Sequence, residues 1–275
     1  MDIHNGVSRH VESIALLRRI ERKEMKSIVE TIYDAQTGVY DIPKVTETHG
    51  KFDIPEAYRL QEELVEKFMS EGRRIIGYKL GLTSREKMLQ MGVESPIHGV
   101  FFEDMFLEDG RIDYSRLIHQ KAEPEVAVKF IEDVPLDASE EELKAAIGVV
   151  APAIDIIDSR FKDFKFTMAD VVADNCSAAQ FAAGEWTAYD PEEINIDNIH
   201  ASLYINDECV SEGVSNAVLG SPITALMEFK DSLAQEGIAI KSGQIVLTGA
   251  ITAASSFKEG DIVINRTDIG EVSMK

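Results

Sequence analysis

Residues 119–128 read HQKAEPEVAV, and this stretch places Glu123 and Glu125 inside a run that otherwise has the composition of a buried strand. Successive side chains of a strand point to opposite faces, so the two glutamates share one face while Ala122 and Val126 share the other. The rise of a strand puts the two carboxylates within about 7 Å of each other. The sequence therefore predicts a strand with one apolar face and a pair of like charges on the other.

Two interpretations of this acidic face stay open. The first is the solvated face of an edge strand, because two glutamates at this spacing are common. The second is a metal site. Buried like charges would force one carboxyl group to stay protonated, and a divalent cation between them removes that conflict. Carboxylate oxygens are hard ligands, which favour Mg²⁺, Mn²⁺ or Ca²⁺ over softer metals.

Two further charges interrupt apolar runs. Asp155 lies within VVAPAIDIIDSR (residues 149–160), on the face opposite Ile154 and Ile156, where a charge is costly unless it is paired or ligated. Three carboxylates from two strands would make an open metal site with room for water or substrate. Lys79 is either a surface lysine with a buried stem or a buried ammonium group that faces an anionic substrate.

The composition argues against several classes of function. The chain has 275 residues, of which 49 are acidic and 28 basic, so the net charge is −21. Nucleic acid and anionic membranes would be repelled by this charge, and no apolar run approaches the length of a membrane span. The N-terminus lacks the pattern of a signal peptide, and Cys176 and Cys209 are too far apart to form a metal-binding pair. We therefore expect a cytoplasmic protein without nucleic-acid or membrane partners.

The chain is predicted to divide into a helical N-terminal region, residues 1–72, and a β-rich catalytic domain, residues 73–275. Apolar residues at helical spacing predict a helix over residues 9–36. Asp53 begins a capping box ahead of a second helix that ends at Gly72. The expected fold class is α+β, with a mostly β main domain.

Short strand-like runs dominate the second region and are interrupted by helices. Thr83 with Glu86 predicts a capped helical turn, and helices are predicted over residues 139–148 and 221–237, the latter capped by Ser221. The predicted strands cover residues 75–80, 98–107, 123–131, 149–158, 201–207, 243–249 and 261–266.

Six segments, taken in order, resemble the fumarylacetoacetate hydrolase superfamily. Their order and spacing are similar to those of the branch that contains 2-hydroxypenta-2,4-dienoate hydratases and 4-oxalocrotonate decarboxylases, over nearly the whole chain. The segments are GYKLGLTS (77–84), HQKAEPEVAV (119–128), PAIDIIDSR (152–160), VADNCSAAQFAAG (172–184), VLGSPI (218–223) and GQIVLTGAITAA (243–254).

Three further features resemble the decarboxylases rather than the hydratases. DIPKVT (41–46), KMLQMGVESPIHG (87–99) and LTGAITAA (247–254) are similar to the decarboxylase sequences. Hydratases typically carry an aspartate where this chain has Ile97, so the loss of that acid argues against water addition. The resemblance implies metal-dependent decarboxylation of 2-oxohex-3-enedioate (4-oxalocrotonate) to 2-hydroxypenta-2,4-dienoate and CO₂, in the meta-cleavage pathway of aromatic degradation. A hydratase and an inactive scaffold paralogue are the alternatives.

The resemblance also implies a β-roll core, a homo-oligomer, and a complex with the hydratase of the same pathway. It makes Mg²⁺ or Mn²⁺ the expected cofactor, and it makes Lys79 the catalytic residue. The implied metal ligands are Glu123, Glu125 and Asp155, and the implied substrate-binding residues are Lys79, Leu80, Asn175 and Thr248. Asp155 stands where close relatives usually have glutamate, so either direct ligation or a bridging water is expected. His119 is expected to be a structural hydrogen-bonding residue.

Overall fold

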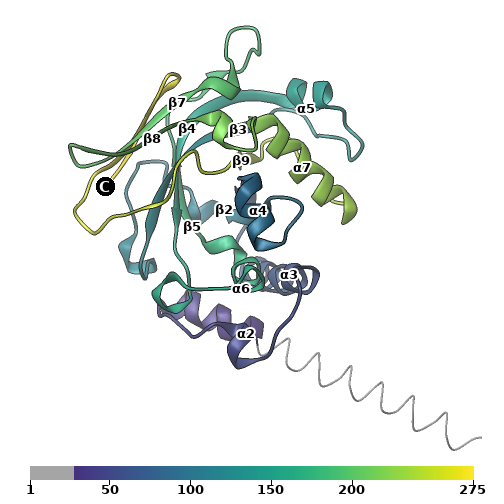
Figure 1. Cartoon of the computed structure of the whole chain (residues 1–275), viewed down its shortest axis with the longest axis vertical. Coiled ribbons are helices and arrows are strands. Elements are labelled where there is room, and N and C mark those ends of the chain that lie inside the picture. Colours follow the sequence, from purple (N-terminus) through teal and green to yellow (C-terminus); the bar gives the residue numbers. More distant parts are fainter. Residues whose placement is uncertain (1–27) are drawn as a thin grey trace, which may run out of the picture.

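The structure is a computed structural model and describes residues 28–275 (Figure 1). Within this range the first helix covers residues 28–38. The rest of the helix predicted over residues 9–36 lies outside the described residues.

Eight strands form the larger sheet, and the pairing within it brings the acidic segments together. The strands are β1 (Ile75–Gly81), β2 (Ile97–Phe102), β3 (Lys121–Phe130), β4 (Ile147–Ile157), β5 (Ala178–Ala183), β6 (Thr187–Ala188), β9 (Ile245–Leu247) and β10 (Ser255–Ser256). Their order is β2-β1-β9-β3-β4-β5, with β10 beside β3 and β6 beside β4. The pairing of β1 with β9 is parallel, and the other pairings of this sheet are antiparallel.

A smaller sheet covers one face of the larger one. It consists of β7 (His200–Ile205), β8 (Glu208–Val214), β11 (Val263–Thr267) and β12 (Gly270–Met274), in the order β12-β11-β7-β8. Ile154 and Ile156 of β4 pack against Leu203 and Val263 of the smaller sheet in one apolar cluster. Because neighbouring side chains alternate, Asp155 must point to the opposite face of β4.

Helices cover the remaining faces and the lower end of the molecule in Figure 1. There α3 packs on α6, and the core joins Leu60 and Leu64 of α3 to Phe101 and Phe102 of β2. The boundary at residue 72 stays a prediction. The helices are α2 (Val45–Thr48), α3 (Ile54–Ser70), α4 (Arg85–Met91), α5 (Glu140–Ala146), α6 (Met168–Ala173) and α7 (Pro222–Gln235). The 3₁₀ turns are η1 (Glu103–Met105), η2 (Tyr114–Arg116), η3 (Lys162–Phe164), η4 (Asn175–Ser177), η5 (Ile196–Asn198) and η6 (Ser215–Ala217).

Two of the three predicted helix caps are confirmed. The Asp53 carboxylate accepts a hydrogen bond from the main-chain N–H of Glu56, and the Ser221 hydroxyl caps α7 in the same way. The cap predicted at Thr83 is wrong. The helix α4 starts one residue later, after Ser84, and the Thr83 side chain instead packs over Gly249.

The strand predictions differ from the structure in several places, and β6, β8, β10 and β12 lie outside the predicted ranges. The strand predicted over residues 98–107 ends at Phe102, because η1 turns the chain there. Strand β5 was not predicted, since its alanine-rich segment has no clear period of two. None of the helices in residues 28–275 is both long enough and apolar enough to cross a membrane.

Candidate active site

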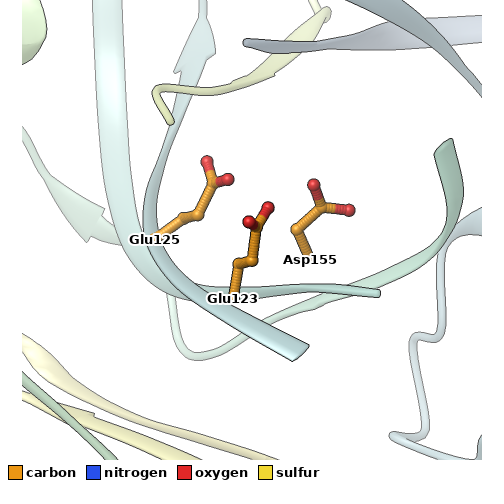
Figure 2. A group of neighbouring side chains, drawn as sticks. All are labelled: Glu123, Glu125 and Asp155. Carbon is orange, nitrogen blue, oxygen red and sulfur yellow. The ribbon is translucent and has the colours of Figure 1, made fainter. Parts of the chain in front are cut away.

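Three carboxylates meet on the inner face of β3 and β4. The register of these antiparallel strands puts Glu123 directly opposite Asp155, and Glu125 follows two residues later on the same face. Figure 2 shows the three side chains next to one another on the same side of the two strands. One oxygen from each carboxylate can be chosen so that all three lie within 4.8 Å of one another. Ligands on opposite sides of one cation are separated by about 4–5 Å, since each metal–oxygen bond is about 2.0–2.6 Å.

The buried members of this group each keep one oxygen open. The Gly249 N–H donates to Glu125 Oε2 at 2.7 Å, and Lys79 Nζ donates to Asp155 Oδ2. Glu125 Oε1 and Asp155 Oδ1 are buried and have no hydrogen-bond partner among the described residues. An unsatisfied anionic oxygen in the interior is costly, and a divalent cation would satisfy both. The donor set therefore fits a hard cation.

Lys79 is a buried ammonium group and not a surface lysine. Only 2% of its surface is exposed. Two strands, β9 and β3, separate β1 from β4 in the sheet, and the Lys79 ammonium group pairs with Asp155 of β4 across their shared face. The interpretation of Lys79 as a surface residue is therefore wrong.

Burial and the neighbouring charges shift the pKa values of these groups. Burial is the largest cause that raises the pKa of Glu125 well above its ordinary value, and Asp155 and Glu123 raise it further. Burial also raises the pKa of Asp155, although Lys79 opposes this shift. Burial alone would lower the pKa of Lys79, but the three carboxylates outweigh it and raise the pKa above the ordinary value. The lysine is therefore a cation at neutral pH.

The loop after β9 fixes the orientation of Glu125. Gly249 has a φ angle of +116°, which favours glycine, and a Cβ atom there would lie 2.5 Å from Thr83. This conformation aims its N–H at Glu125. Both the N–H and the hydroxyl of Thr248 donate to the Val126 carbonyl at 3.0 Å, so Thr248 fastens the loop to β3. Its predicted role in substrate binding stays a prediction.

The other two predicted substrate-binding residues lie near β2. Leu80 is buried on the face of β1 opposite Lys79, among core side chains. The Asn175 amide accepts from the Val100 N–H at 2.7 Å and donates to the Val100 carbonyl at 2.9 Å, which holds η4 against β2. Substrate contacts by Leu80 and Asn175 stay predictions. Ile97 of β2 is buried and apolar.

His119 makes its structural hydrogen bond through the main chain. Its main-chain N–H donates to Asp158 at 2.8 Å, but the ring nitrogen Nε2 is buried without a partner among the described residues. The ring packs instead against Phe164, with 5.3 Å between ring centroids.

Sequence reasoning missed a second buried charge cluster. Arg160 donates from its main-chain N–H and from Nε to the carboxylate of Asp174, and its guanidinium group also donates to the carbonyls of Asp174 and Ala178. Both side chains are almost fully buried. Both charges occur in segments that carry the family resemblance, but their spacing in the sequence gives no sign that they pair.

The chain belongs to the fumarylacetoacetate hydrolase family, because residues 103–275 match the family model described as fumarylacetoacetate (FAA) hydrolase C-terminal. The chain is 36% identical to 4-oxalocrotonate decarboxylase of Pseudomonas putida over 264 residues, which are 94% of this chain and 98% of that protein. It is also 36% identical to 2-keto-4-pentenoate hydratase 1 of Dechloromonas aromatica (strain RCB), over 211 residues, 76% of this chain and 80% of that protein.

Solved structures give the same assignment. 4-Oxalocrotonate decarboxylase from Pseudomonas putida G7, complexed with magnesium and adipate, is similar with a TM-score of 0.86 and 35% identity, over 92% of this chain and 97% of that chain. A second structure of that enzyme is complexed with calcium and acetate. The predicted family and the α+β fold class are confirmed, and the chain is an enzyme of this family.

Proposed function

We propose that the protein decarboxylates 2-oxohex-3-enedioate (4-oxalocrotonate) to 2-hydroxypenta-2,4-dienoate and CO₂, as a metal-dependent carboxy-lyase of the meta-cleavage pathway of aromatic degradation. The observation that carries the proposal is the group of three converging carboxylates beside a buried lysine. Similarity to 4-oxalocrotonate decarboxylase along nearly the full length of both chains supports the choice of substrate.

Glu123, Glu125 and Asp155 would hold Mg²⁺ or Mn²⁺. A bound cation would act as a Lewis acid that stabilises negative charge on the substrate's C2 oxygen. Asp155 is shorter than glutamate, but its Oδ1 remains open while Oδ2 is bonded to Lys79, and its oxygens lie close to those of the glutamates. These distances favour direct ligation by Asp155 over a bridging water.

The reaction moves one electron pair along the conjugated chain of the substrate. When C6 leaves as CO₂, the pair of the C5–C6 bond forms a C4–C5 double bond, the C3–C4 pair moves to C2–C3, and the carbonyl pair moves to the C2 oxygen. One proton on that oxygen then gives 2-hydroxypenta-2,4-dienoate.

Lys79 would donate a hydrogen bond to the developing oxyanion and supply this proton. Its raised pKa keeps the amine protonated, because the surrounding carboxylates outweigh the effect of burial. A Schiff base would need the neutral amine, which this environment disfavours. Burial of Lys79 and Asp155 also excludes bulk water from the side of the site where charge develops.

Hydration of 2-hydroxypenta-2,4-dienoate is the second candidate function, and the 36% identity to a hydratase favours it. The apolar side chain of Ile97 argues against this function, since hydratases of the branch typically carry an aspartate at this position. An inactive scaffold is less consistent with the site, because a scaffold gains nothing from buried anionic oxygens without partners.

A product assay tests these alternatives directly. The purified chain with Mg²⁺ is incubated with 2-oxohex-3-enedioate and, separately, with 2-hydroxypenta-2,4-dienoate, while CO₂ release and water addition are followed. We expect CO₂ release without hydration. Faster hydration would identify a hydratase, and undiminished activity after treatment with EDTA would contradict the metal requirement.

We also propose a cytoplasmic homo-oligomer that binds the hydratase of the same pathway. The family resemblance supports both self-association and binding to the hydratase. The free thiols of Cys176 and Cys209 suit a reducing compartment. Light scattering after gel filtration, with and without the hydratase, measures both associations. Monomers that elute separately would contradict them.

A further inference from the structure

The inner face of β3 carries a positive charge that the proposed chemistry does not use. Lys121 lies two residues before Glu123, so the two side chains share this face. Lys121 is half-buried, and its Nζ lies 4.3 Å from the centroid of the Phe164 ring. The aromatic face attracts the ammonium group and displaces part of its hydration.

The loop that supplies Phe164 has an unusual backbone. Asp163 and Phe164 have φ angles of +56° and +57°, a conformation that costs energy for residues other than glycine. The same ring contacts His119, whose buried Nε2 lacks a partner among the described residues. Lys121, Phe164 and His119 thus form a cluster that begins on β3 two residues before Glu123.

The charges of the site show why another cation is useful there. Glu123, Glu125 and Asp155 carry three negative charges when ionised, and Lys79 with one divalent cation carries three positive charges. The site would then be neutral, whereas the proposed substrate is a dianion. Lys121 supplies one further positive charge on the same face.

The spacing also fits the length of the substrate. The Cα atoms of Lys121 and Glu123 are about 7 Å apart, from the rise of a strand. An extended six-carbon dicarboxylate has a similar length, since its five carbon–carbon bonds are about 1.5 Å each. A ligand that lies along β3 with one end at the metal therefore extends about as far as the position of Lys121 on the strand.

We propose that Lys121 binds the carboxylate of the substrate that lies farther from the metal, and that Phe164 and His119 hold the lysine in place for it. The proposal rests on the proposed function for the orientation of the ligand. It makes Lys121 the residue that distinguishes dicarboxylates from monocarboxylates of the same length. The lost carboxylate would depart from the Lys121 end of the site.

The test compares the binding of two six-carbon probes, adipate and hexanoate, by calorimetry in the presence of Mg²⁺. Lys121→Met should weaken adipate binding at least tenfold and leave hexanoate binding within twofold. Lys129→Met is the matched control, because Lys129 lies on the same face of β3 near the other end of the strand and is also half-buried. The control should change neither affinity. Lys121→Arg should retain most of the adipate affinity, since it keeps the charge.

Equal weakening of both probes in Lys121→Met would mean a general structural role, and unchanged adipate binding would exclude contact with the far carboxylate. Either result overturns the inference. Failure of the proposed function looks different. If the parent releases no CO₂ while Lys121→Met still weakens adipate binding, the dicarboxylate site stands and only the proposed reaction is wrong. Conversely, if Lys121→Met releases CO₂ with a parental KM, the proposed reaction stands and Lys121 has no role in substrate binding.

Discussion

The carboxylate group of β3 and β4 and the ion pair between Arg160 and Asp174 are both buried, yet their polar atoms are satisfied to different degrees. Asp174 accepts two hydrogen bonds from Arg160 on its carboxylate, and the guanidinium group also bonds two carbonyls. In the carboxylate group, Glu125 Oε1 and Asp155 Oδ1 have no partner within residues 28–275.

This difference separates a charge cluster that maintains the fold from one that is available for binding. A complete network has nothing left to offer a ligand, and removing one member leaves a buried charge without compensation. An open network destabilises the fold, because buried polar atoms lack partners. A ligand that supplies those partners is bound more tightly, since its binding removes this cost. Substitutions in the two clusters should therefore affect different measurements.

The largest effect is expected at the open cluster. Glu125→Ala removes a ligand and should lower turnover roughly ten-thousand-fold, near 5 kcal/mol of transition-state stabilisation, with little change in circular dichroism. Glu123→Ala should behave in the same way. A Glu125→Ala protein with parental turnover would remove this group from the active site.

The closed cluster should respond in stability. Arg160→Met leaves Asp174 buried without its partner, and we expect the free energy of unfolding in urea to fall by roughly 3–5 kcal/mol. Arg59→Met is the control, because Arg59 pairs with Glu56 on the exposed side of α3 and should cost less than about 1 kcal/mol. Equal losses in the two variants would mean that the buried ion pair contributes no more to stability than an exposed one.

Lys79 belongs to the open cluster, and its removal should affect turnover more than folding. Lys79→Met keeps the packing of the stem but removes the ammonium group, so turnover should fall about a hundredfold, or ~2.7 kcal/mol. The metal-free variant should also lose stability, since Asp155 loses its partner, and Mg²⁺ should restore most of it. Near-parental turnover would exclude a role in the chemical step.

Asp155 tests whether the third carboxylate reaches the metal. Asp155→Asn keeps the shape and removes the charge, so calorimetry should show metal affinity at least tenfold weaker, about 1.4 kcal/mol. Asp155→Glu should retain part of the affinity. An Asp155→Asn protein that binds Mg²⁺ as tightly as the parent would leave the two glutamates as the ligands.

The smallest effect concerns metal-free stability and its dependence on pH. Burial, Asp155 and Glu123 raise the pKa of Glu125 in the folded state, so folding favours its protonated form. That contribution is fully present below the ordinary carboxyl pKa and is lost as pH rises. Glu125→Gln mimics the protonated form and should be more stable than the metal-free parent by roughly 1 kcal/mol at pH 8. The difference should vanish near pH 4, and a difference that grows toward low pH would reverse the assignment.

The carboxylate face was predictable because a strand has a period of two. Glu123 and Glu125 had to share a face, and Asp155 had to lie opposite its apolar neighbours. The register that sets Glu123 against Asp155 depends on the turn through α5 and on packing against the smaller sheet, which local spacing does not encode.

Contacts between distant segments could not be predicted from the sequence either, because local spacing does not encode them. The Gly249 N–H reaches Glu125 only because β9 lies beside β3, and Arg160 meets Asp174 only because η4 folds back on the end of β4. Thr83 fits the pattern of a helix cap, yet contact with Gly249 overrides that local preference. Asn175, Cys176 and Ser177 of η4 all have positive φ angles, and none of them is a glycine that would predict this conformation.

The side-chain amide of Asn175 also determines whether the outer strand β2 has free main-chain groups. Val100 belongs to β2, the outermost strand of the larger sheet, and the amide occupies both its N–H and its carbonyl. An outer strand with free main-chain groups is a template on which another polypeptide can add a strand. The Asn175 side chain imitates that added strand within its own chain. Since β2 is buried along its whole length, this side chain closes the main-chain groups of Val100 that no neighbouring strand of the sheet can reach.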